Sequence, residues 1–444
     1  MMMKNFDYTK EPLRDILLID AKSFYASCEC VARGLHPLKT MLVVLSNADN
    51  TGSGLVLAAS PLAKKVLGIS NVTRANQVPN DPHLLKVPPR MNYYIDMNLK
   101  INQIFRQYVA DEDLLIYSID ESILDVTKTL NLFFPNANMS RQEKRWRFAR
   151  MIQLHVKKET GIYLTVGIGD NPLLAKLALD IESKHSPTFI AEWRYKDVEE
   201  KVWQIEPMTA FWGIGSRMEK QFQRLGLFTI KDVANANPAR LKQAFGILGL
   251  QHYHHANGID RTILSEPAPA IREKSYGNSQ VLPRDYQKPE EIETVIKEMA
   301  DQVAARIRKQ GCKTSCIHLY IGFSYHEEAA GFSHQIKIPA TDSTKKLVEY
   351  LLYIFRKYYE GEAVRHIGVT YSKLSYTTHT QLNLFESPDQ IIREQNLDKV
   401  IDSIRDKYGF TAIVHANSLS QGARSIARSG LVGGHDGGQK ENKR

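Results

Sequence analysis

The sequence predicts a multi-domain protein of the α+β class, and three observations support this fold class. The chain has 444 residues, which is too long for one small core and indicates two to four domains. The segment 265–272 contains the Pro/Ala run "SEPAPAI", which is typical of a linker. Beyond it, apolar patterns follow in the order β-α-β-β-α-β, which indicates a ferredoxin-like module.

The part before the linker alternates short apolar strands with helices. Residues 15–20 ("DILLID") predict a buried strand that ends at Asp20, and "SFYASCECVARG" predicts a helix that stops at Gly34. The further elements expected here are strands 40–47 and 53–60, a helix from Pro61, a helix over 92–110, a helix over 141–161, a strand over 162–169, and a helix capped by Asn171 with Pro172 in its first turn.

The part after the linker has longer elements. They are expected as a strand at 273–282, a helix at 288–310, strands at 313–323 and 331–338, a helix at 342–358 and a strand at 364–374. An amphipathic stretch follows at 388–407. The ending "LVGGHDGGQKENKR" is rich in glycine and polar residues, so we expect it to lack a fixed structure.

Composition and charge narrow the class of protein. Hydrophobic residues make up 43% of the chain and charged residues 24%, as in a globular protein that dissolves in water. The net charge of +9 suggests a polyanionic partner. The sequence has no apolar run long enough to span a bilayer, and its first fifteen residues lack the apolar core of a signal peptide. We therefore expect a cytoplasmic, nucleoid-associated protein without a membrane partner.

Cysteines and histidines give no metal-binding pattern. The spacings C-x-C and C-x₃-C do not match a zinc site and are too few for a disulfide framework, so we expect four free thiols at Cys28, Cys30, Cys312 and Cys316. The cluster "HYHHANG" (252–258) has no acids or cysteines beside it. We expect its histidines on the surface.

The run "LLIYSIDESILDV" places two acids, Asp120 and Glu121, side by side in an apolar stretch. If the chain reverses at this pair, the run splits into the strands "LLIYSI" and "SILDV" with both carboxylates at the hairpin tip, although Asp-Glu is poor turn chemistry. Asp20 ends a strand that could lie beside them. Three such carboxylates suit Mg²⁺, and two ions can hold the attacking and leaving oxygens in phosphoryl transfer. The alternative is a solvated turn and one chance aspartate.

The runs "IDAKSFYASCE" (19–29) and "YSIDESILDV" (117–126) together resemble the Y-family translesion DNA polymerases. The resemblance covers residues 14 to 415 and is closest to the UmuC-like (ImpB/MucB/SamB-type) branch of bacterial SOS polymerases. It implies a right-hand polymerase in which the ferredoxin-like module is the little finger. The implied domains are a palm at 1–30 and 92–180, fingers at 31–91, a helix-hairpin-helix thumb at 181–264, the linker at 265–272, the little finger at 273–376 and a tail at 377–444.

The resemblance also implies an activity. It is low-fidelity, template-directed addition of dNTPs to a primer 3′-OH with two Mg²⁺ ions, in DNA damage tolerance. The implied metal ligands are Asp20, Asp120, Glu121 and the carbonyl of Ala21. The first alternative is a catalytically impaired DNA- and clamp-binding protein of the same fold. The second, a palm-fold nucleotidyl cyclase, would not explain the thumb, the little finger or the clamp-binding peptide.

The nucleotide site is also implied by the resemblance. Phe24 and Tyr25 would lie beneath the incoming nucleotide, with Tyr25 as the steric gate that excludes a ribose 2′-OH. Lys64 in "SPLAKK" would bind the triphosphate, and Lys65 is the alternative because the motif carries one residue more than expected.

Two prolines depart from the family pattern. Many relatives have Tyr where this chain has Pro61 and a phosphate-binding Lys where it has Pro172. Pro172 can pre-set a helix N-terminus, whose free N–H groups attract phosphate, but it carries no charge. We expect Lys176, one turn later, to compensate.

The DNA contacts are expected in the thumb and little finger. "WGIGSRMEKQFQRLGLFTIKDVA" resembles a helix-hairpin-helix, in which Gly213 and Gly215 let backbone N–H groups approach a DNA phosphate. A Rossmann interpretation of the two Gly-Ile-Gly triplets is excluded, since neither extends to G-x-G-x-x-G. The candidate phosphate contacts of the little finger are Arg272, Lys274 and Arg284; a solvated basic face is the alternative.

The pentapeptide "QLNLF" (381–385) resembles the motif by which bacterial polymerases bind the sliding clamp. Its expected contacts are Gln381, Leu382, Leu384 and Phe385. The alternative is that Leu384 and Phe385 pack back on this protein. The other expected partners are primer-template DNA, dNTPs and possible SOS accessory subunits.

Overall fold

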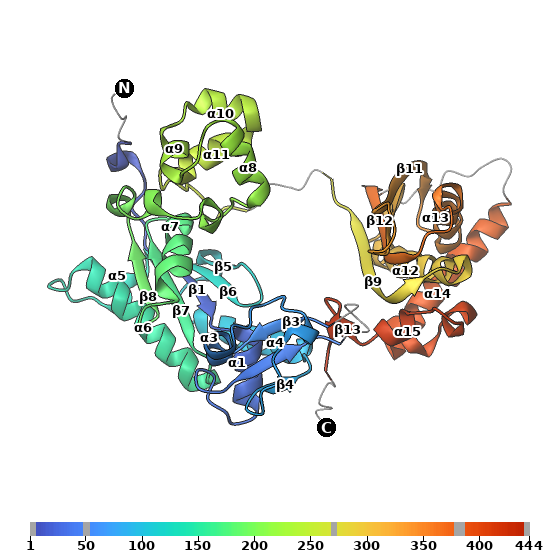
Figure 1. The fold of residues 1–444 in the computed structure, drawn as a ribbon, viewed down its shortest axis with the longest axis horizontal. Helices are drawn as coiled ribbons and strands as arrows, with labels where there is room; N and C mark the ends of the chain where they lie inside the picture. The colour runs from blue at the N-terminus through green and yellow to red at the C-terminus, as the bar shows by residue number, and fades with distance from the viewer. Residues whose placement is uncertain (1–5, 48–53, 268–272, 377–386, 439–444) are drawn as a thin grey trace. The chain divides into compact units, whose positions relative to one another are not determined.

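The computed structural model of the protein describes residues 6–47, 54–267, 273–376 and 387–438 (Figure 1). The chain forms two compact units. The first comprises Met1–Leu42, Ala58–Gly68 and Tyr93–Ala268, and the second comprises Val43–Leu57, Ile69–Asn92 and Pro269–Arg444. Sheets and helices in both units confirm the predicted multi-domain α+β class.

A five-stranded sheet forms the centre of the first unit, in the order β5-β6-β1-β7-β8. Its middle strand β1 is antiparallel to both neighbours, and β7 is parallel to β8. The fully buried residues of β1 and β7 explain why both read as continuous apolar runs. The strands are β1 (Ile16–Ala21), β5 (Leu114–Ile116), β6 (Glu121–Asp125), β7 (Leu164–Gly169) and β8 (Ile190–Trp193).

Helices surround this sheet. The predicted cap of α7 is confirmed, because the Asn171 side chain accepts a hydrogen bond from Leu174 N; Ser140 caps α6 in the same way by accepting one from Glu143 N. A π-helical turn, Ala178–Ser183, continues α7. The helices are α1 (Phe24–Ala32), α4 (Met91–Phe105), α5 (Leu130–Phe133), α6 (Arg141–Thr160) and α7 (Pro172–Leu177).

Two glycines of β7 allow α7 to approach the sheet closely. A Cβ atom at Gly167 would lie 2.0 Å from the carbonyl oxygen of Ala175, and one at Gly169 would lie 2.3 Å from the Ala175 nitrogen. Because backbone atoms cannot yield as a flexible side chain can, only glycine fits at these positions. The first Gly-Ile-Gly triplet therefore serves packing, and it fixes the helix that carries Lys176.

The predicted reversal at Asp120–Glu121 is wrong by several residues. β5 ends at Ile116, the turn covers residues 117–120, and Glu121 is the first residue of β6. The Ser118 hydroxyl accepts a hydrogen bond from the Glu121 nitrogen (3.0 Å) and donates one to Asp120 Oδ1 (2.8 Å). This side chain closes the turn, as Ser commonly does, and the sequence pattern did not reveal it.

The segment of the first unit that begins at residue 206 consists of short helices joined by glycine turns, as predicted. Gly213 has φ +93°, a conformation that favours glycine, whereas Gly215 has φ −92° as the N-cap of α8. His252 packs edge-on against Phe222 in the core, so its predicted surface position is wrong. The helices are α8 (Ser216–Arg224), α9 (Ile230–Asn235), α10 (Pro238–Phe245) and α11 (Ile247–Ala256).

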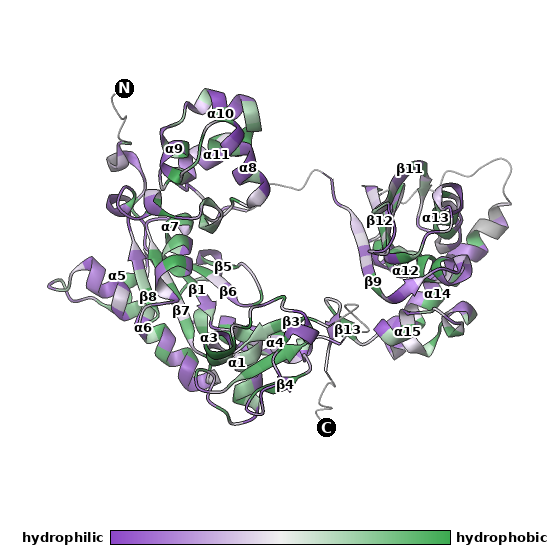
Figure 2. Ribbon diagram, viewed as in Figure 1, coloured by the Kyte–Doolittle hydropathy of each residue, from purple (hydrophilic) through white to green (hydrophobic). Residues whose placement is uncertain are grey.

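A small three-stranded sheet, in the order β3-β2-β4, lies within residues 31–91. Its strands are β2 (Leu42–Leu45), β3 (Val56–Ala59) and β4 (Leu85–Val87), and β3 is hydrophobic along its length (Figure 2). Helix α3 (Pro61–Leu67) follows, with Ser60 as its N-cap and Gly68 in the left-handed C-cap conformation. Both strands and the helix predicted here are confirmed.

The second unit contains the predicted β-α-β-β-α-β module. Its sheet is antiparallel in the order β11-β10-β12-β9, so β12 lies between the two strands joined by the first helix. One sheet face packs on both helices through apolar residues such as Val303, Ile317 and Leu351. The elements are β9 (Tyr276–Tyr286), α12 (Pro289–Lys309), β10 (Lys313–Phe323), β11 (Gly331–Thr341), α13 (Thr344–Tyr358) and β12 (Val364–Ser375).

The segment after this module is more ordered than predicted. Helix α14 (Pro388–Tyr408) matches the amphipathic stretch, and α15 (Ser425–Arg428) follows. β13 (Leu431–Val432) and β14 (His435–Asp436) then form a hairpin within the ending that was expected to lack structure. Gly433 and Gly434 both have positive φ, which a tight two-residue hairpin requires, so the glycines favour a turn here.

Two expected absences can be compared with the described residues. All four cysteines are free and buried, as predicted. In the ranges that the structure describes, we find no helix that combines the length and the apolar character needed to cross a membrane.

Candidate active site

Three carboxylates meet at one end of the five-stranded sheet. Asp20 on β1 is paired with Glu121 on β6, and the nitrogen of Ala21 donates a hydrogen bond to the carbonyl oxygen of Asp120 (2.9 Å). The antiparallel register thus brings together acids that lie a hundred residues apart in the sequence. The backbones of Asp20, Asp120 and Glu121 therefore lie close together, and their role as one metal site stays a prediction.

The carboxylate of Asp20 has a raised pKa. Burial raises its pKa to about 6, opposed by the charge of Lys184 and reinforced by the charges of Asp120 and Glu121. Thr165 Oγ1 donates a hydrogen bond to Asp20 Oδ1 (3.1 Å). A raised pKa means that the ionised form lacks sufficient compensating positive charge, and a bound cation would supply it.

The donor atoms at this site suit a hard divalent ion. Carboxylate oxygens and the Ala21 carbonyl are the ligand types that Mg²⁺ prefers. Across the described ranges, however, no three His, Cys, Asp or Glu side chains are arranged to hold an ion. Glu121 is instead paired with Lys176 (2.5 Å), and Asp120 accepts a hydrogen bond from Ser118 (2.8 Å). The residues fit the ion, but their side chains would have to turn toward it.

Lysines surround the acids. Lys176 Nζ contacts both Glu121 and Asp180 (3.2 Å), and Lys184 Nζ donates a hydrogen bond to Asp180 (2.7 Å). Partial burial lowers the pKa of Lys64, and the negative charge of Asp20 partly offsets this effect. The two lysines predicted to bind the nucleotide, Lys64 and Lys176, are therefore close to the carboxylates.

Lys184 is a candidate site residue that the sequence analysis missed. It influences Asp20 electrostatically and is anchored by Asp180. A signal was present, because Lys184 follows Lys176 by eight residues, about two helical turns, and such residues lie on one helix face. The π-helical turn between them could not be read from that spacing.

The predicted steric gate is held by a buried aromatic neighbour. Phe24 is buried, whereas Tyr25 is half-buried and stacks on Tyr94 with ring centroids 4.4 Å apart and planes inclined by 15°. The Tyr94 hydroxyl donates a hydrogen bond to Glu29 (2.8 Å), and both residues are fully buried. Tyr94 on α4 therefore supports the ring of Tyr25, which lies on α1, the helix that follows Asp20.

The predicted DNA-binding residues of the second unit are only partly described. Lys274 is exposed, while Arg284 pairs with Glu291 (2.5 Å) and stacks over the Tyr286 ring. Arg284 is thus already engaged within its own unit. Outside the described residues lie Arg272, Gln381, Leu382, Leu384 and Phe385.

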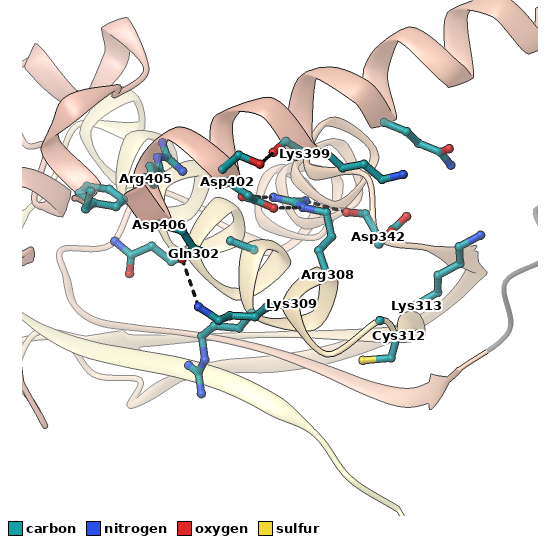
Figure 3. A pocket seen from close by; sticks show the side chains of 16 residues that line it. Gln302, Arg308, Lys309, Cys312, Lys313, Asp342, Lys399, Asp402, Arg405 and Asp406 are labelled. Atoms are coloured by element: carbon teal, nitrogen blue, oxygen red, sulfur yellow. Dashed lines mark hydrogen bonds and ion pairs between the residues drawn. The ribbon is translucent and has the colours of Figure 1, made fainter. Parts of the chain in front are cut away.

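The second unit also contains a cavity of about 850 Å³ between α12, α14 and the start of β10 (Figure 3). Most of the charged side chains that line it are basic, and two of them form ion pairs: Arg308 contacts Asp402 (2.6 Å), and Lys309 contacts Asp406 (3.1 Å). These pairs attach α14 to α12. The acids named here are therefore engaged in helix packing.

Comparison with known sequences gives matches at both ends of the chain. Residues 19–180 match the impB/mucB/samB family, and residues 273–384 match the C-terminal domain of the same family. The first match contains Asp20, Asp120, Glu121 and Lys176. The second contains the β-α-β-β-α-β module.

Individual relatives and one solved structure agree with this match. UvrX of Bacillus subtilis (strain 168), named for UV-damage repair, is 40% identical over 97% of this chain and 99% of its own length. DNA polymerase IV 2 of the same organism is 34% identical over 95% and 98%. A Y-family DNA polymerase chimera of Dbh and Dpo4 has a similar fold, with TM-score 0.63 and 22% identity over 82% of this chain and 100% of the chimera.

Proposed function

The chain belongs to the impB/mucB/samB family of UmuC-like Y-family DNA polymerases and is a DNA-directed DNA polymerase, and we propose that it performs low-fidelity translesion synthesis in DNA damage tolerance and SOS mutagenesis. The observation that carries this proposal is the meeting of Asp20, Asp120 and Glu121 at the end of β1 and β6. A carboxylate cluster short of positive charge is suited to metal-assisted phosphoryl transfer.

Asp20, Asp120, Glu121 and the carbonyl of Ala21 would hold two Mg²⁺ ions. When bound, these ions would activate the primer 3′-OH and neutralise charge on the nucleotide phosphates. The raised pKa of Asp20 supports this assignment, because a nearby cation would offset the cost of keeping a buried carboxylate ionised and the smaller repulsion from Asp120 and Glu121.

Lysines would hold the triphosphate of the incoming dNTP. Lys64, Lys176 and Lys184 provide three ammonium groups near the acids, and a triphosphate is an anion of matching charge. Lys176 would then exchange Glu121 for a phosphate, which would free Glu121 for metal. Tyr25, supported by Tyr94, would occupy the space that a ribose 2′-OH needs.

Two further contacts are proposed from the sequence. Backbone N–H groups around Gly213 and Gly215 would bind a DNA phosphate, and the open space around Gly215 is consistent with close approach. The pentapeptide 381–385 would bind the sliding clamp as a short extended peptide.

The rival proposal is a polymerase fold that binds DNA but does not catalyse. Pro172 removes a lysine that many relatives have, which favours this rival. Lys176 and Lys184 argue against it, because they supply positive charge to the same site.

Replacing Asp120 with Asn tests the proposal. Wild-type protein should extend a primer over undamaged, abasic and pyrimidine-dimer templates, whereas Asp120→Asn should lose extension on all of them because a charged metal ligand is missing. Its DNA affinity should stay within about twofold, since the substitution is nearly isosteric. Glu112→Gln, which removes an exposed carboxylate from the preceding 3₁₀ turn, is the matched control and should remain active.

Two outcomes would contradict the proposal. Full extension by Asp120→Asn would refute the metal assignment. An inactive wild-type protein that still binds primer-template DNA would favour the non-catalytic rival.

A further inference from the structure

Lys22 joins the strand that carries Asp20 to the turn that carries Lys184. It follows the end of β1, and its backbone nitrogen donates a hydrogen bond to the carbonyl oxygen of Tyr163 (2.9 Å). Its Nζ donates a second hydrogen bond to the carbonyl oxygen of Lys184 (3.1 Å). Lys22 thus connects two segments of the active site that lie 162 residues apart.

The Lys184 carbonyl requires such a partner. Lys184 is the C-cap of the π-helical turn Ala178–Ser183, and the last carbonyls of a helix have no partner within it. A lysine often binds them from the same helix, but here the ammonium group comes from a different strand. π-Helical turns are rare and are frequently found at functional sites. The cap by Lys22 therefore fixes the backbone of a turn that lies beside the proposed active site.

The Phe189 ring contacts the ammonium group of Lys22. The Lys22 Nζ lies 4.5 Å from the centre of the Phe189 ring, close enough for a cation–π interaction. Phe189 has φ +57°, which is unfavourable for a non-glycine residue. Its carbonyl accepts hydrogen bonds from Val166 N (2.8 Å) and Ser183 Oγ (3.0 Å), and these contacts hold the strained backbone in place.

Lys184 is therefore held at two points, its ammonium group and its backbone carbonyl. Asp180 holds its Nζ (2.7 Å), and Lys22 holds its carbonyl (3.1 Å). Lys22 and Lys184 repel each other, yet both are kept near Asp20. Like charges held together beside a site that would bind phosphates suggest that a polyanion completes the arrangement.

We propose that Lys22 is a positioning residue for the incoming nucleotide, which acts by capping the π-turn so that Lys184 meets the triphosphate. This inference rests on the proposed polymerase function. It assigns to Lys22 a role distinct from metal binding, steric gating and direct phosphate contact.

The first test replaces Lys22 with Met, which keeps most of the stem and removes the ammonium group. We expect KM for dNTP to rise about tenfold and kcat to change less than about threefold, because an interaction that orients bound nucleotide is lost. Lys22→Arg should restore KM to within about threefold, since it retains a donor and a positive charge. Lys39→Met, at an exposed lysine on the same unit, is the matched control and should leave KM unchanged.

A double-mutant cycle separates positioning from direct contact. In a Lys184→Met background, adding Lys22→Met should raise KM by less than about twofold, because the residue on which Lys22 acts is already gone. If the two effects multiply in full, Lys22 contacts the nucleotide independently and the positioning role is overturned.

Thermal stabilisation by dNTP and DNA affinity distinguish the positioning role of Lys22 from a merely structural one. The thermal stabilisation of the DNA complex by dNTP, with Ca²⁺ replacing Mg²⁺ to prevent turnover, should be reduced in Lys22→Met and retained in Lys39→Met. DNA affinity should stay within about twofold. If Lys22→Met fails to fold, Phe189→Leu removes only the cation–π support and should raise KM about threefold.

Failure of this inference can be told apart from failure of the proposed function. If wild-type protein extends primers and Lys22→Met has an unchanged KM, only the role of Lys22 is refuted. If wild-type protein does not extend primers, the proposed function is refuted. Nucleotide-dependent thermal stabilisation still tests Lys22 in that case, and an equal shift in wild type and Lys22→Met would overturn the inference.

Discussion

Two charged clusters of the molecule contrast in how their acids are paired. The palm cluster comprises Asp20, Asp120, Glu121, Lys176 and Lys184. There, the pKa of Asp20 is raised to about 6, because burial and the charges of Asp120 and Glu121 together outweigh the opposing charge of Lys184. The side-chain hydrogen bond that Asp20 accepts comes from the neutral Thr165.

The little-finger cluster comprises Arg308, Asp398 and Asp402. Arg308 contacts Asp402 (2.6 Å) and Asp398 (3.4 Å), and it also donates hydrogen bonds to the Asp342 carbonyl (2.8 Å) and to Thr344 (2.9 Å). Each buried charge here has a partner within the same unit. Acids paired directly with a buried arginine indicate packing, whereas a buried acid that lies beside two other acids, as Asp20 does, indicates a site that a cation completes.

The strongest test of this contrast is Asp20→Asn. Activity should fall more than about a thousandfold, because a charged metal ligand is lost. Stability should nevertheless increase in metal-free buffer at pH 7, by up to about 3 kcal/mol, because the shift of about two pKa units reflects the cost of keeping Asp20 ionised. Primer extension and urea unfolding measure the two effects.

The size of the stability gain from Asp20→Asn depends on pH. The folded state binds a proton at Asp20 more tightly than the unfolded state. The free-energy cost of ionising Asp20 in the folded protein is therefore absent below about pH 4 and complete above about pH 6. Asp20→Asn should therefore gain little stability at pH 4. A variant that is less stable than wild type at pH 7 would show that the ionised form of Asp20 stabilises the fold, and the contrast would fail.

Local patterns made most of the fold predictable from the sequence. The apolar runs of β1 and β7, the cap at Asn171 and the β-α-β-β-α-β order all follow from spacing or from one side chain. The approach of Asp20 to Glu121 was expected because Asp20 ends one apolar run and the pair Asp120–Glu121 interrupts another.

Other features depend on contacts that sequence spacing does not contain. The turn at 117–120 is closed by the Ser118 hydroxyl, and the need for glycine at 167 comes from the backbone of a different element. Lys184 reaches the site through a π-turn, which adds a residue that no periodic pattern predicts. The cap that Lys22 places on that turn joins two distant segments, so only the tertiary structure could reveal it.

The second test of the contrast is Arg308→Met. It leaves Asp402 and Asp398 without their partner, and the free energy of unfolding should fall by about 3 kcal/mol. Polymerase activity per folded molecule should be unchanged. Urea unfolding with circular dichroism, together with primer extension, measures both quantities.

A neighbouring pair provides the control. Lys309 and Asp406 are both 66% exposed, so Lys309→Met should cost less than about 0.5 kcal/mol. If Arg308→Met abolished catalysis without loss of stability, the little-finger cluster would be a functional site and the contrast would fail.

The third test uses pH to alter the palm cluster alone. Below about pH 6, Asp20 takes up a proton, and protons then compete with Mg²⁺ for its oxygens. The Mg²⁺ concentration for half-maximal extension should rise by about tenfold per pH unit below pH 6 and stay flat above pH 7. Arg308 remains charged throughout this range. A half-maximal Mg²⁺ concentration independent of pH would mean that Asp20 does not bind the ion.

The smallest expected effect distinguishes two adjacent lysines of α3. Both lysines are exposed, but partial burial lowers the pKa of Lys64 and the charge of Asp20 acts on it in the opposite direction. If the charge of Lys64 beside Asp20 serves nucleotide binding, Lys64→Ala should raise KM for dNTP about fivefold and Lys65→Ala less than about twofold. Both variants lose the same charge and have the same helix propensity, so each controls for the other. Steady-state single-nucleotide insertion measures the difference, and a larger effect at Lys65 would assign the triphosphate contact to the residue that follows Lys64.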